Sequence, residues 1–267
     1  MKGLIIVALF AVCATHLVAQ SAPQAPLTFE VASVKPVTDP NARNTGGFPP
    51  GRVFMSKVTL QTLILMAYEV PDYRVVNAGP AWIGSDYFSI EAKAPEFVGG
   101  PATTPQMMPM IRALLADRFK LVIRRESREL PIFTLVFARA DGRLGPQLRR
   151  SQIDCSPEGR TRAAAAGRRV CGVIMEPTPA GLRSFKADGV LFSTLVNRAA
   201  DALAREIRDT TGLSGLFDWE LMWADRPEVE GPTLPIAFQE QLGLKLEPGR
   251  GPVDLLIIES AERPTPN

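Results

Sequence analysis

Histidine is nearly absent from this sequence. The one histidine, His16, lies in an N-terminal segment with the pattern of a secretory signal peptide. In that segment Lys2 is followed by the apolar run Leu4–Val12 and by small residues that lead to Ala19. We therefore expect residues 1–20 to be removed on export. A mature chain without histidine excludes a Ser-His-Asp or Cys-His catalytic site and a His-ligated zinc site.

Long hydrophobic runs are also missing. The run Leu4–Val12 is far shorter than the roughly 20 apolar residues that a transmembrane helix needs. Val12 precedes Cys13 at the position where a lipoprotein signal has a small residue, so a lipid anchor is not expected. The sequence therefore predicts a periplasmic or extracellular protein with no membrane span after signal cleavage.

Neither sign of charge dominates. Removing Lys2 turns 30 Lys and Arg into 29, against 28 Asp and Glu, so the mature chain carries a formal charge of +1. That balance excludes a general attraction to nucleic acid or to anionic lipid. A hydrophobic content of 46% excludes disorder of the whole chain.

Cysteine is scarce, and the mature chain keeps only Cys155 and Cys171. An even pair in an exported chain indicates a disulfide. By closing a loop in the unfolded chain, such a bond would raise the free energy of unfolding by about 3 kcal/mol in the chain-entropy model. The alternative, a lone catalytic thiol, lacks an imidazole partner.

What the sequence does have is a pattern that occurs twice, in Met110–Phe137 and in Leu234–Ile258. Each copy has a short helix, a Phe-Lys-Leu or Leu-Lys-Leu signature, a turn with proline and a final strand. The pattern predicts separate strands on either side of each turn: Phe119–Glu126 and Pro131–Arg139, then Leu244–Glu247 and Val253–Glu259.

The flanking segments are doubled as well. Apolar residues at helical spacing predict a helix after Thr59 and another from Phe192, at an offset of 132. Tyr87–Lys93 and Phe217–Trp223 alternate like half-buried strands. We predict an α+β protein of two similar halves made by internal duplication, each a mostly antiparallel sheet with two helices. The expected divisions are a signal peptide (1–20), a first repeat (27–140), a basic linker (141–170) and a second repeat (171–264).

The predicted linker is rich in arginine. It holds Arg149, Arg150, Arg160, Arg162, Arg168 and Arg169. A solvated connector is the interpretation that we favour, and a polyanion site is the alternative. No aromatic side chain is interleaved to stack on bases.

Several motifs together resemble a known family. They are FEVASVKP, VTLQTLILMAYEVPDYRVVNAGPAWIGSDYFSIEAKAP, LLADRFKL, RELPIFTLVFAR, TGLSGLFDWELMW and EQLGLKLEPGRGPVDLLIIESAERP. From Phe29 to Pro264 the chain resembles the secreted paralogous family expanded in soil acidobacteria of the Solibacter type, a domain of unknown function. Some relatives carry a similar domain on a membrane metallopeptidase sensor of the β-lactam-receptor type, which implies an envelope or signalling setting. Members often have histidine near the position of Arg124.

Carboxylates are the remaining route to catalysis. Paired acids hydrolyse glycosides when they lie about 5–9 Å apart. Glu91 and Glu220 occupy equivalent strand positions, as do Ser89 and Asp218. The alternative is that they are solvent-facing strand residues, and we favour it. Asp86 and Asp117 are expected at a turn and a helix end.

Other groups are weaker candidates. Trp82, Trp219 and Trp223 could stack on a sugar, but strand alternation favours core packing for the last two. The pairs Ser56-Lys57 and Ser184 with Lys186 lack the Ser-x-x-Lys spacing. The sequence shows no glycine-rich phosphate loop and no cluster of metal ligands. We assign no catalytic residue, metal ligand or cofactor, and the binding residues stay unknown.

The sequence favours a non-catalytic binding or sensory module of the cell envelope. The alternative is a secreted carboxylate-dependent hydrolase. The expected partner is an envelope protein or peptide, and not nucleic acid. Any pocket is expected between the halves, near Pro95–Pro105 and Ala224–Pro235.

Overall fold

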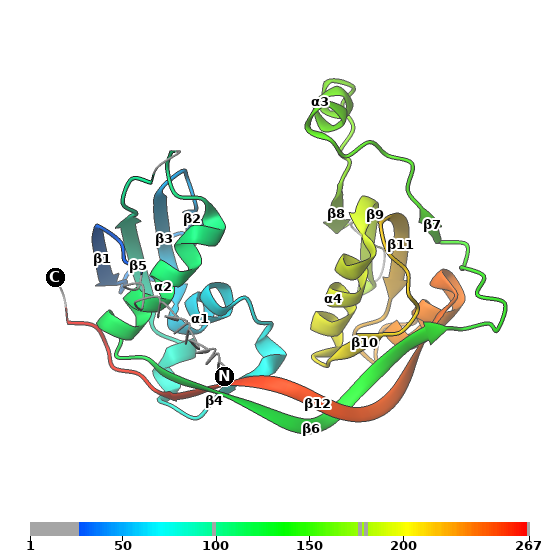
Figure 1. The fold of residues 1–267 in the computed structure, drawn as a ribbon. Coiled ribbons are helices and arrows are strands. Elements are labelled where there is room, and N and C mark those ends of the chain that lie inside the picture. Colours follow the sequence, from blue (N-terminus) through cyan, green and yellow to red (C-terminus); the bar gives the residue numbers. More distant parts are fainter. Residues whose placement is uncertain (1–26, 98–99, 176–177, 179–180, 266–267) are drawn as a thin grey trace, which may run out of the picture.

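The protein has two lobes joined by a long two-stranded ribbon of β6 (Val122–Phe137) and β12 (Leu244–Ser260) (Figure 1). The structure is a computed structural model and describes residues 27–97, 100–175, 178 and 181–265. The predicted signal peptide lies outside these residues. The predicted fold class, α+β with mostly antiparallel strands, is confirmed.

The first lobe packs one antiparallel sheet against two helices. The strand order is β1 (Val31–Pro36), β5 (Tyr87–Lys93), β3 (Arg52–Thr59) and β2 (Thr45–Gly47). The helices are α1 (Leu60–Tyr68) and α2 (Thr104–Arg118), with 3₁₀ turns η1 (Asp72–Arg74) and η2 (Ala81–Gly84) between them. The core lies between the sheet and the helices.

Local chemistry explains both helix starts. The Thr59 hydroxyl accepts a hydrogen bond from the Thr62 N–H (3.2 Å), as expected for an N-cap, and α1 then buries its predicted apolar stripe. Helix α2 begins at Thr104. The reason is a capping box, in which the Thr103 N–H donates to Gln106 Oε1 (2.8 Å).

The second lobe has the same two-layer construction. Its sheet runs in the order β7 (Leu148–Arg150), β11 (Leu216–Trp223), β9 (Arg183–Leu191) and β8 (Gly172–Met175). The helices are α4 (Phe192–Leu203), α5 (Leu234–Ala237) and the π-helical turn η4 (Phe238–Leu242). Trp219, Leu221 and Trp223 are buried in the core, as their alternation predicts.

A third sheet is shared by both lobes and was not predicted. Its order is β10 (Ile207–Asp209), β6, β12 and β4 (Val75–Asn77). Strand β4 pairs in parallel with the end of β12, and β10 pairs in parallel with the end of β6. Leu256 of β12 therefore lies in the first core, and Leu135 of β6 lies in the second. Each half ends in a strand that completes the other lobe.

The predicted strand breaks at the two prolines are wrong, because β6 and β12 run through them. Pro131 lies opposite Arg250, and Pro252 opposite Glu129. Two residues after Pro131, the Phe133 N–H points away from β12 and donates to the Glu206 carbonyl. Alternation turns the nitrogen of Pro131 to the same outer side, where its missing N–H costs no hydrogen bond of the β6–β12 pair.

The halves share the element order strand, helix, short strand, strand, helix, long strand, from β3 to β6 and from β9 to β12. The internal duplication itself stays a prediction. The arginine-rich segment 141–170 contains β7 and the helix α3 (Pro157–Ala165), which projects from the second lobe (Figure 1). In residues 27–265, gaps aside, no helix is both long and apolar enough to cross a membrane.

Candidate functional site

A polar hollow of about 190 Å³ lies on the second sheet, on the face away from the core. Asp218 and Glu220 reach it from β11, Lys186 and Asp188 from β9, and Arg149 from β7. The hollow is completed by Pro146, Gln147, Ala187 and Trp219. It therefore lies within one lobe, whereas the sequence placed a pocket between the halves.

Asp218 is the one buried acid of this hollow, with 8% of its surface exposed. Its Oδ1 accepts from the Gly189 N–H (2.9 Å), and its Oδ2 accepts from Arg149 Nε (3.1 Å). Burial works to raise the pKa of Asp218, but hydrogen bonds from Ser151, Gly189 and Arg149 outweigh it and lower that pKa below its usual range. Asp218 is therefore a charged anchor.

A β-bulge explains the position of Asp218. Between the pairs Phe217–Val190 and Trp219–Ala187, β9 has two residues, Asp188 and Gly189, opposite the single residue Asp218, so the extra residue lies in β9. Strand alternation puts both Phe217 and Trp219 in the core, and the bulge of β9 brings the Gly189 N–H to the Asp218 carboxylate.

The candidate acids do not converge. Glu91 lies in a separate hollow on the first sheet, with Val31, Arg52 and Phe54, whereas Glu220 lies in the second lobe. Asp86 accepts from Arg263 (2.8 Å), and Asp117 pairs with Arg118 at the end of α2. In the described part of the chain, no group of three His, Cys, Asp or Glu could hold a metal ion.

The remaining candidates serve packing. The Trp82 ring stacks on Phe119 with centroids 6.5 Å apart, and the Arg263 guanidinium lies 5.1 Å above it. Trp219 and Trp223 are only 3% and 5% exposed, so neither is available to stack on a sugar. Ser184 is buried, which removes it from solvent as a nucleophile beside Lys186.

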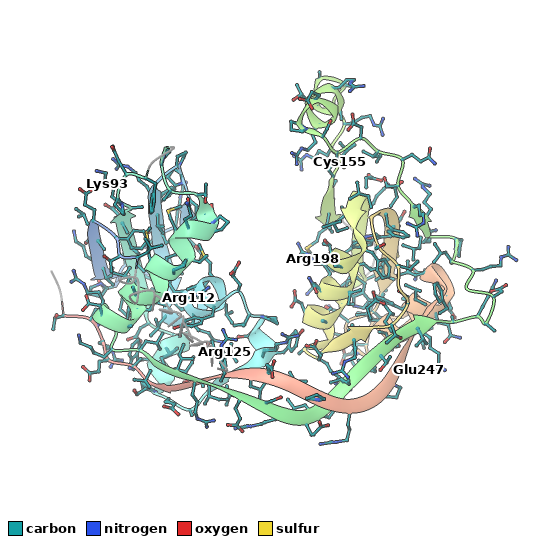
Figure 2. The ribbon with its side chains drawn as sticks, viewed as in Figure 1. Lys93, Arg112, Arg125, Cys155, Arg198 and Glu247 are labelled. Carbon is teal, nitrogen blue, oxygen red and sulfur yellow. A yellow bond between two sulfur atoms is a disulfide. The ribbon has the colours of Figure 1, made fainter. Side chains whose placement is uncertain are left out.

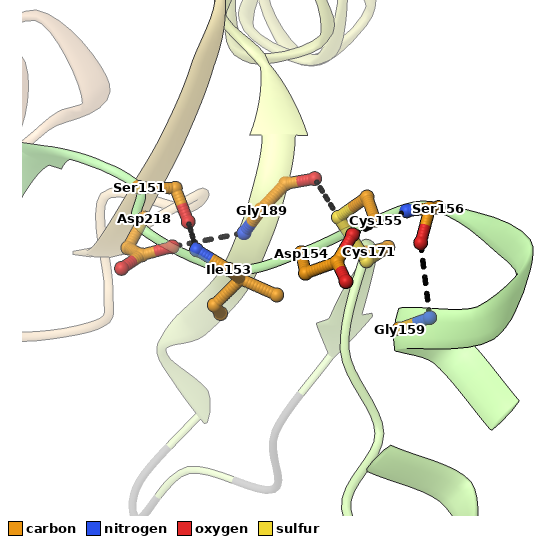
Figure 3. The surroundings of a disulfide bond; sticks show 9 residues. All are labelled: Ser151, Ile153, Asp154, Cys155, Ser156, Gly159, Cys171, Gly189 and Asp218. Carbon is orange, nitrogen blue, oxygen red and sulfur yellow. Dashed lines mark hydrogen bonds between the residues drawn. A yellow bond between two sulfur atoms is a disulfide. The ribbon is translucent and has the colours of Figure 1, made fainter. Parts of the chain in front are cut away.

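The predicted disulfide Cys155–Cys171 is present, with Cα atoms 5.8 Å apart. It lies at the base of α3 and is linked to the sheet through Gly189 (Figure 3). The Gly189 carbonyl oxygen lies 3.2 Å from Cys155 Sγ, and its N–H binds Asp218. Gly189 has φ +65° and a Cβ there would lie 2.7 Å from that sulfur, so glycine is required.

A second hollow, of about 400 Å³, lies between α3 and β8. Figure 2 shows Cys155 where the projecting helix meets the lobe. The lining combines charge with apolar surface: Arg160, Ala164, Arg168, Arg169, Val170, Gly172, Val173 and Ile174. We call this the α3–β8 groove.

Residues 61–261 match the family described as "Protein of unknown function (DUF3738)". The chain belongs to this family. The match spans both lobes and the α3 segment, so the α3–β8 groove lies within the DUF3738 region. No curated protein and no solved structure matches the chain.

Sequence reasoning named Asp218 and Glu220 as candidate acids but favoured solvent-facing positions for them, and for Asp218 that expectation is wrong, because the residue is buried. It noted the arginines of segment 141–170 and favoured a solvated connector. It missed Gly189, whose role depends on a contact with Cys155, 34 residues earlier in the chain. It also missed that three of these arginines line one hollow with the edge strand β8, because no local pattern reports which strand lies last in a sheet.

Proposed function

We propose that this DUF3738 protein is exported and acts as a non-catalytic binding module of the cell envelope, in the periplasm or outside the cell. The signal-peptide pattern of residues 1–20 supports export. The disulfide is a bond that persists in oxidising compartments. The partner is an envelope protein or peptide.

The observation that carries the binding role is the α3–β8 groove. Helix α3 buries only Gly159, so it adds no apolar face to the core. A helix of nine residues is marginal without packing. This one is held by the disulfide and by Ser156, whose hydroxyl accepts from the Gly159 N–H (3.0 Å). Helix α3 is therefore held in place without contributing to the core, and this supports a role in contacting a partner.

The alternative is a secreted carboxylate-dependent hydrolase, and the polar hollow with Asp188, Asp218 and Glu220 is the place for it. Glycoside hydrolysis needs a carboxylic acid that stays protonated near neutral pH. The pKa of Asp218 is lowered, which is the opposite of what a general acid needs. Burial raises the pKa of Asp201, but that residue belongs to α4 and does not line the hollow.

Export and binding are tested in the organism that makes the protein. Mass spectrometry of the envelope fraction should find a mature chain that begins near Gln20 or Ala22, and an intact Met1 would contradict export. A photo-crosslinking amino acid at Arg168 should give a discrete adduct with an envelope component, whereas the same group at the exposed Arg43 should not. Equal or absent adducts at both positions would contradict a binding role for the groove.

The hydrolase is tested separately. Purified mature protein should show no turnover of aryl glycosides, esters or peptides beyond that of matched Glu220→Gln and Asp218→Asn variants. Turnover that both variants abolish would establish the alternative.

A further inference from the structure

The α3–β8 groove includes a free strand edge. Three successive residues of β8, Gly172, Val173 and Ile174, line it. The lining includes no residue of β9, the strand that pairs with β8, so the hollow lies on the side of β8 away from β9. β8 is the last strand of its sheet, and no described strand pairs with its other edge. Backbone N–H and C=O groups are therefore presented to the groove.

The charge of the groove is positive, and its arginine side chains have no polar partner among the residues that the structure describes. Arg160, Arg168 and Arg169 make no side-chain hydrogen bond or ion pair with any described residue, whereas Arg162 pairs with Asp154 (3.4 Å). Guanidinium groups bind carboxylates through charge-assisted, often bidentate hydrogen bonds. Three of them along one groove complement an acidic ligand.

The groove is also apolar at its floor. Val170, Val173 and Ile174 line it, and Met175 at the end of β8 is 59% exposed. Apolar strand residues beside a free edge favour a ligand whose own side chains alternate. An anionic lipid or a nucleic acid would use the arginines but not the strand edge, and no aromatic side chain lines the groove to stack on a base.

We propose that β8 binds an extended segment of a partner protein as an added strand, with acidic side chains of that segment paired to Arg160, Arg168 and Arg169. This inference rests on the proposed binding function and names its ligand class. The disulfide sets the distance between α3 and β8, because Cys155 precedes the helix and Cys171 precedes the strand. The pairing of backbone with β8 supplies affinity, and the arginines select for acidic residues.

The test uses the full mature chain with its disulfide intact and a fluorescent peptide of alternating Glu and Val. Fluorescence anisotropy should show saturable binding. The double variant Arg168→Ala/Arg169→Ala should weaken it by about tenfold or more, because it removes two guanidinium groups that make charge-assisted hydrogen bonds with the acidic side chains. The matched control Arg43→Ala/Arg139→Ala removes the same charge from exposed sites elsewhere and should leave binding unchanged.

Strand addition is separated from simple charge attraction by the peptide backbone. The same peptide with an N-methyl group on every residue keeps its charge but can donate no backbone hydrogen bond from either edge, and it should bind about tenfold more weakly or not at all. Hydrogen exchange should also slow at the amides of Gly172–Met175 when the unmodified peptide binds.

Three results would overturn the inference. The first is equal binding of methylated and unmodified peptides. The second is equal loss of binding in both double-arginine variants. The third is stronger binding to phosphatidylglycerol vesicles or to heparin than to the peptide, which would make the groove a general anion site. If no acidic peptide binds while the crosslinker at position 168 still captures an envelope component, this inference fails and the proposed function stands.

Discussion

The backbone N–H of Gly189 donates to the carboxylate of Asp218 at 2.9 Å, while the Gly189 carbonyl oxygen contacts Cys155 Sγ at 3.2 Å (Figure 3). Gly189, which lies in the bulge of β9, thus connects Asp218 of β11 to the disulfide that fixes α3. We therefore expect substitutions at Gly189 or Asp218 to affect both the stability of the second sheet and the position of the α3–β8 groove.

We expect Asp218→Asn to lower the free energy of unfolding by about 1–3 kcal/mol, because an amide nitrogen would face donors where a carboxylate oxygen now accepts. Urea denaturation of the mature chain measures this loss. Glu220→Gln, two residues along the same strand and only partly buried, is the matched control and should change little. Equal midpoints for wild type and Asp218→Asn would contradict the anchoring role.

The same carboxylate predicts a pH dependence. The pKa of Asp218 is lowered in the folded chain, so its contribution to stability is complete above the ordinary aspartate pKa of about 3.9. The contribution is lost as pH falls through the lower folded pKa. The stability gap between wild type and Asp218→Asn should therefore narrow in acid, as measured by urea denaturation between neutral pH and about pH 3. A gap that stays constant would show that the charge plays no part.

The phenol of Tyr73 should lose its proton at a higher pH than an ordinary tyrosine. Burial, followed by the Glu206 carboxylate, raises the pKa of Tyr73 to about 12. Its hydroxyl donates to Glu206 Oε2 (3.3 Å), which also pairs with Arg74. Stability from the neutral phenol is complete below the ordinary tyrosine pKa of about 10 and is lost as pH rises through 12. Burial also raises the pKa of Tyr68, so the measurement uses a Tyr68→Phe background. There, ultraviolet absorbance should show a late tyrosinate step that disappears on adding Tyr73→Phe and moves to lower pH on adding Glu206→Gln. A late step that remains after Tyr73→Phe would refute the assignment.

Because β12, the last strand of the second half, completes the first lobe, we expect a residue near the C-terminus to stabilise that lobe. Leu256 is 1% exposed and belongs to the first core, so Leu256→Ala should cost about 2–5 kcal/mol. Hydrogen exchange should accelerate in α1, about 190 residues earlier in the sequence. Leu191→Ala, at a residue that is 56% exposed, is the control and should have little effect. Faster exchange confined to the second lobe would contradict the exchange of strands.

Reduction of the disulfide should release α3. Alkylation without reductant should label neither Cys155 nor Cys171. With reductant, trypsin should cut faster at Arg160 and Arg162, because the helix has no core contact to hold it. The free energy of unfolding should fall by about 3 kcal/mol at most. If α3 resists trypsin equally in both states, an interaction other than the disulfide holds it.

Local structure followed from the sequence wherever short-range chemistry decides it. The apolar stripes of α1 and α4 lie where the 3.6-residue period puts them, and Thr59 caps α1 because its hydroxyl reaches an N–H three residues ahead. Alternation also put Trp219 and Trp223 in the core. The pairing of Cys155 with Cys171 followed from their being the only two cysteines outside the predicted signal peptide.

Only the tertiary structure decided which lobe each final strand completes. The patterns of β6 and β12 show that their residues become buried, but burial alone does not say against which partner. Pro131 and Pro252 suggested strand breaks because proline has no N–H to donate to a neighbouring strand. The missing N–H is harmful only where the nitrogen faces the partner strand, and the partner of each proline lies far away in the sequence. The α3–β8 groove also depends on tertiary structure. The disulfide brings α3 beside β8, the sheet order leaves β8 at an edge, and neither feature is a property of any one stretch of sequence.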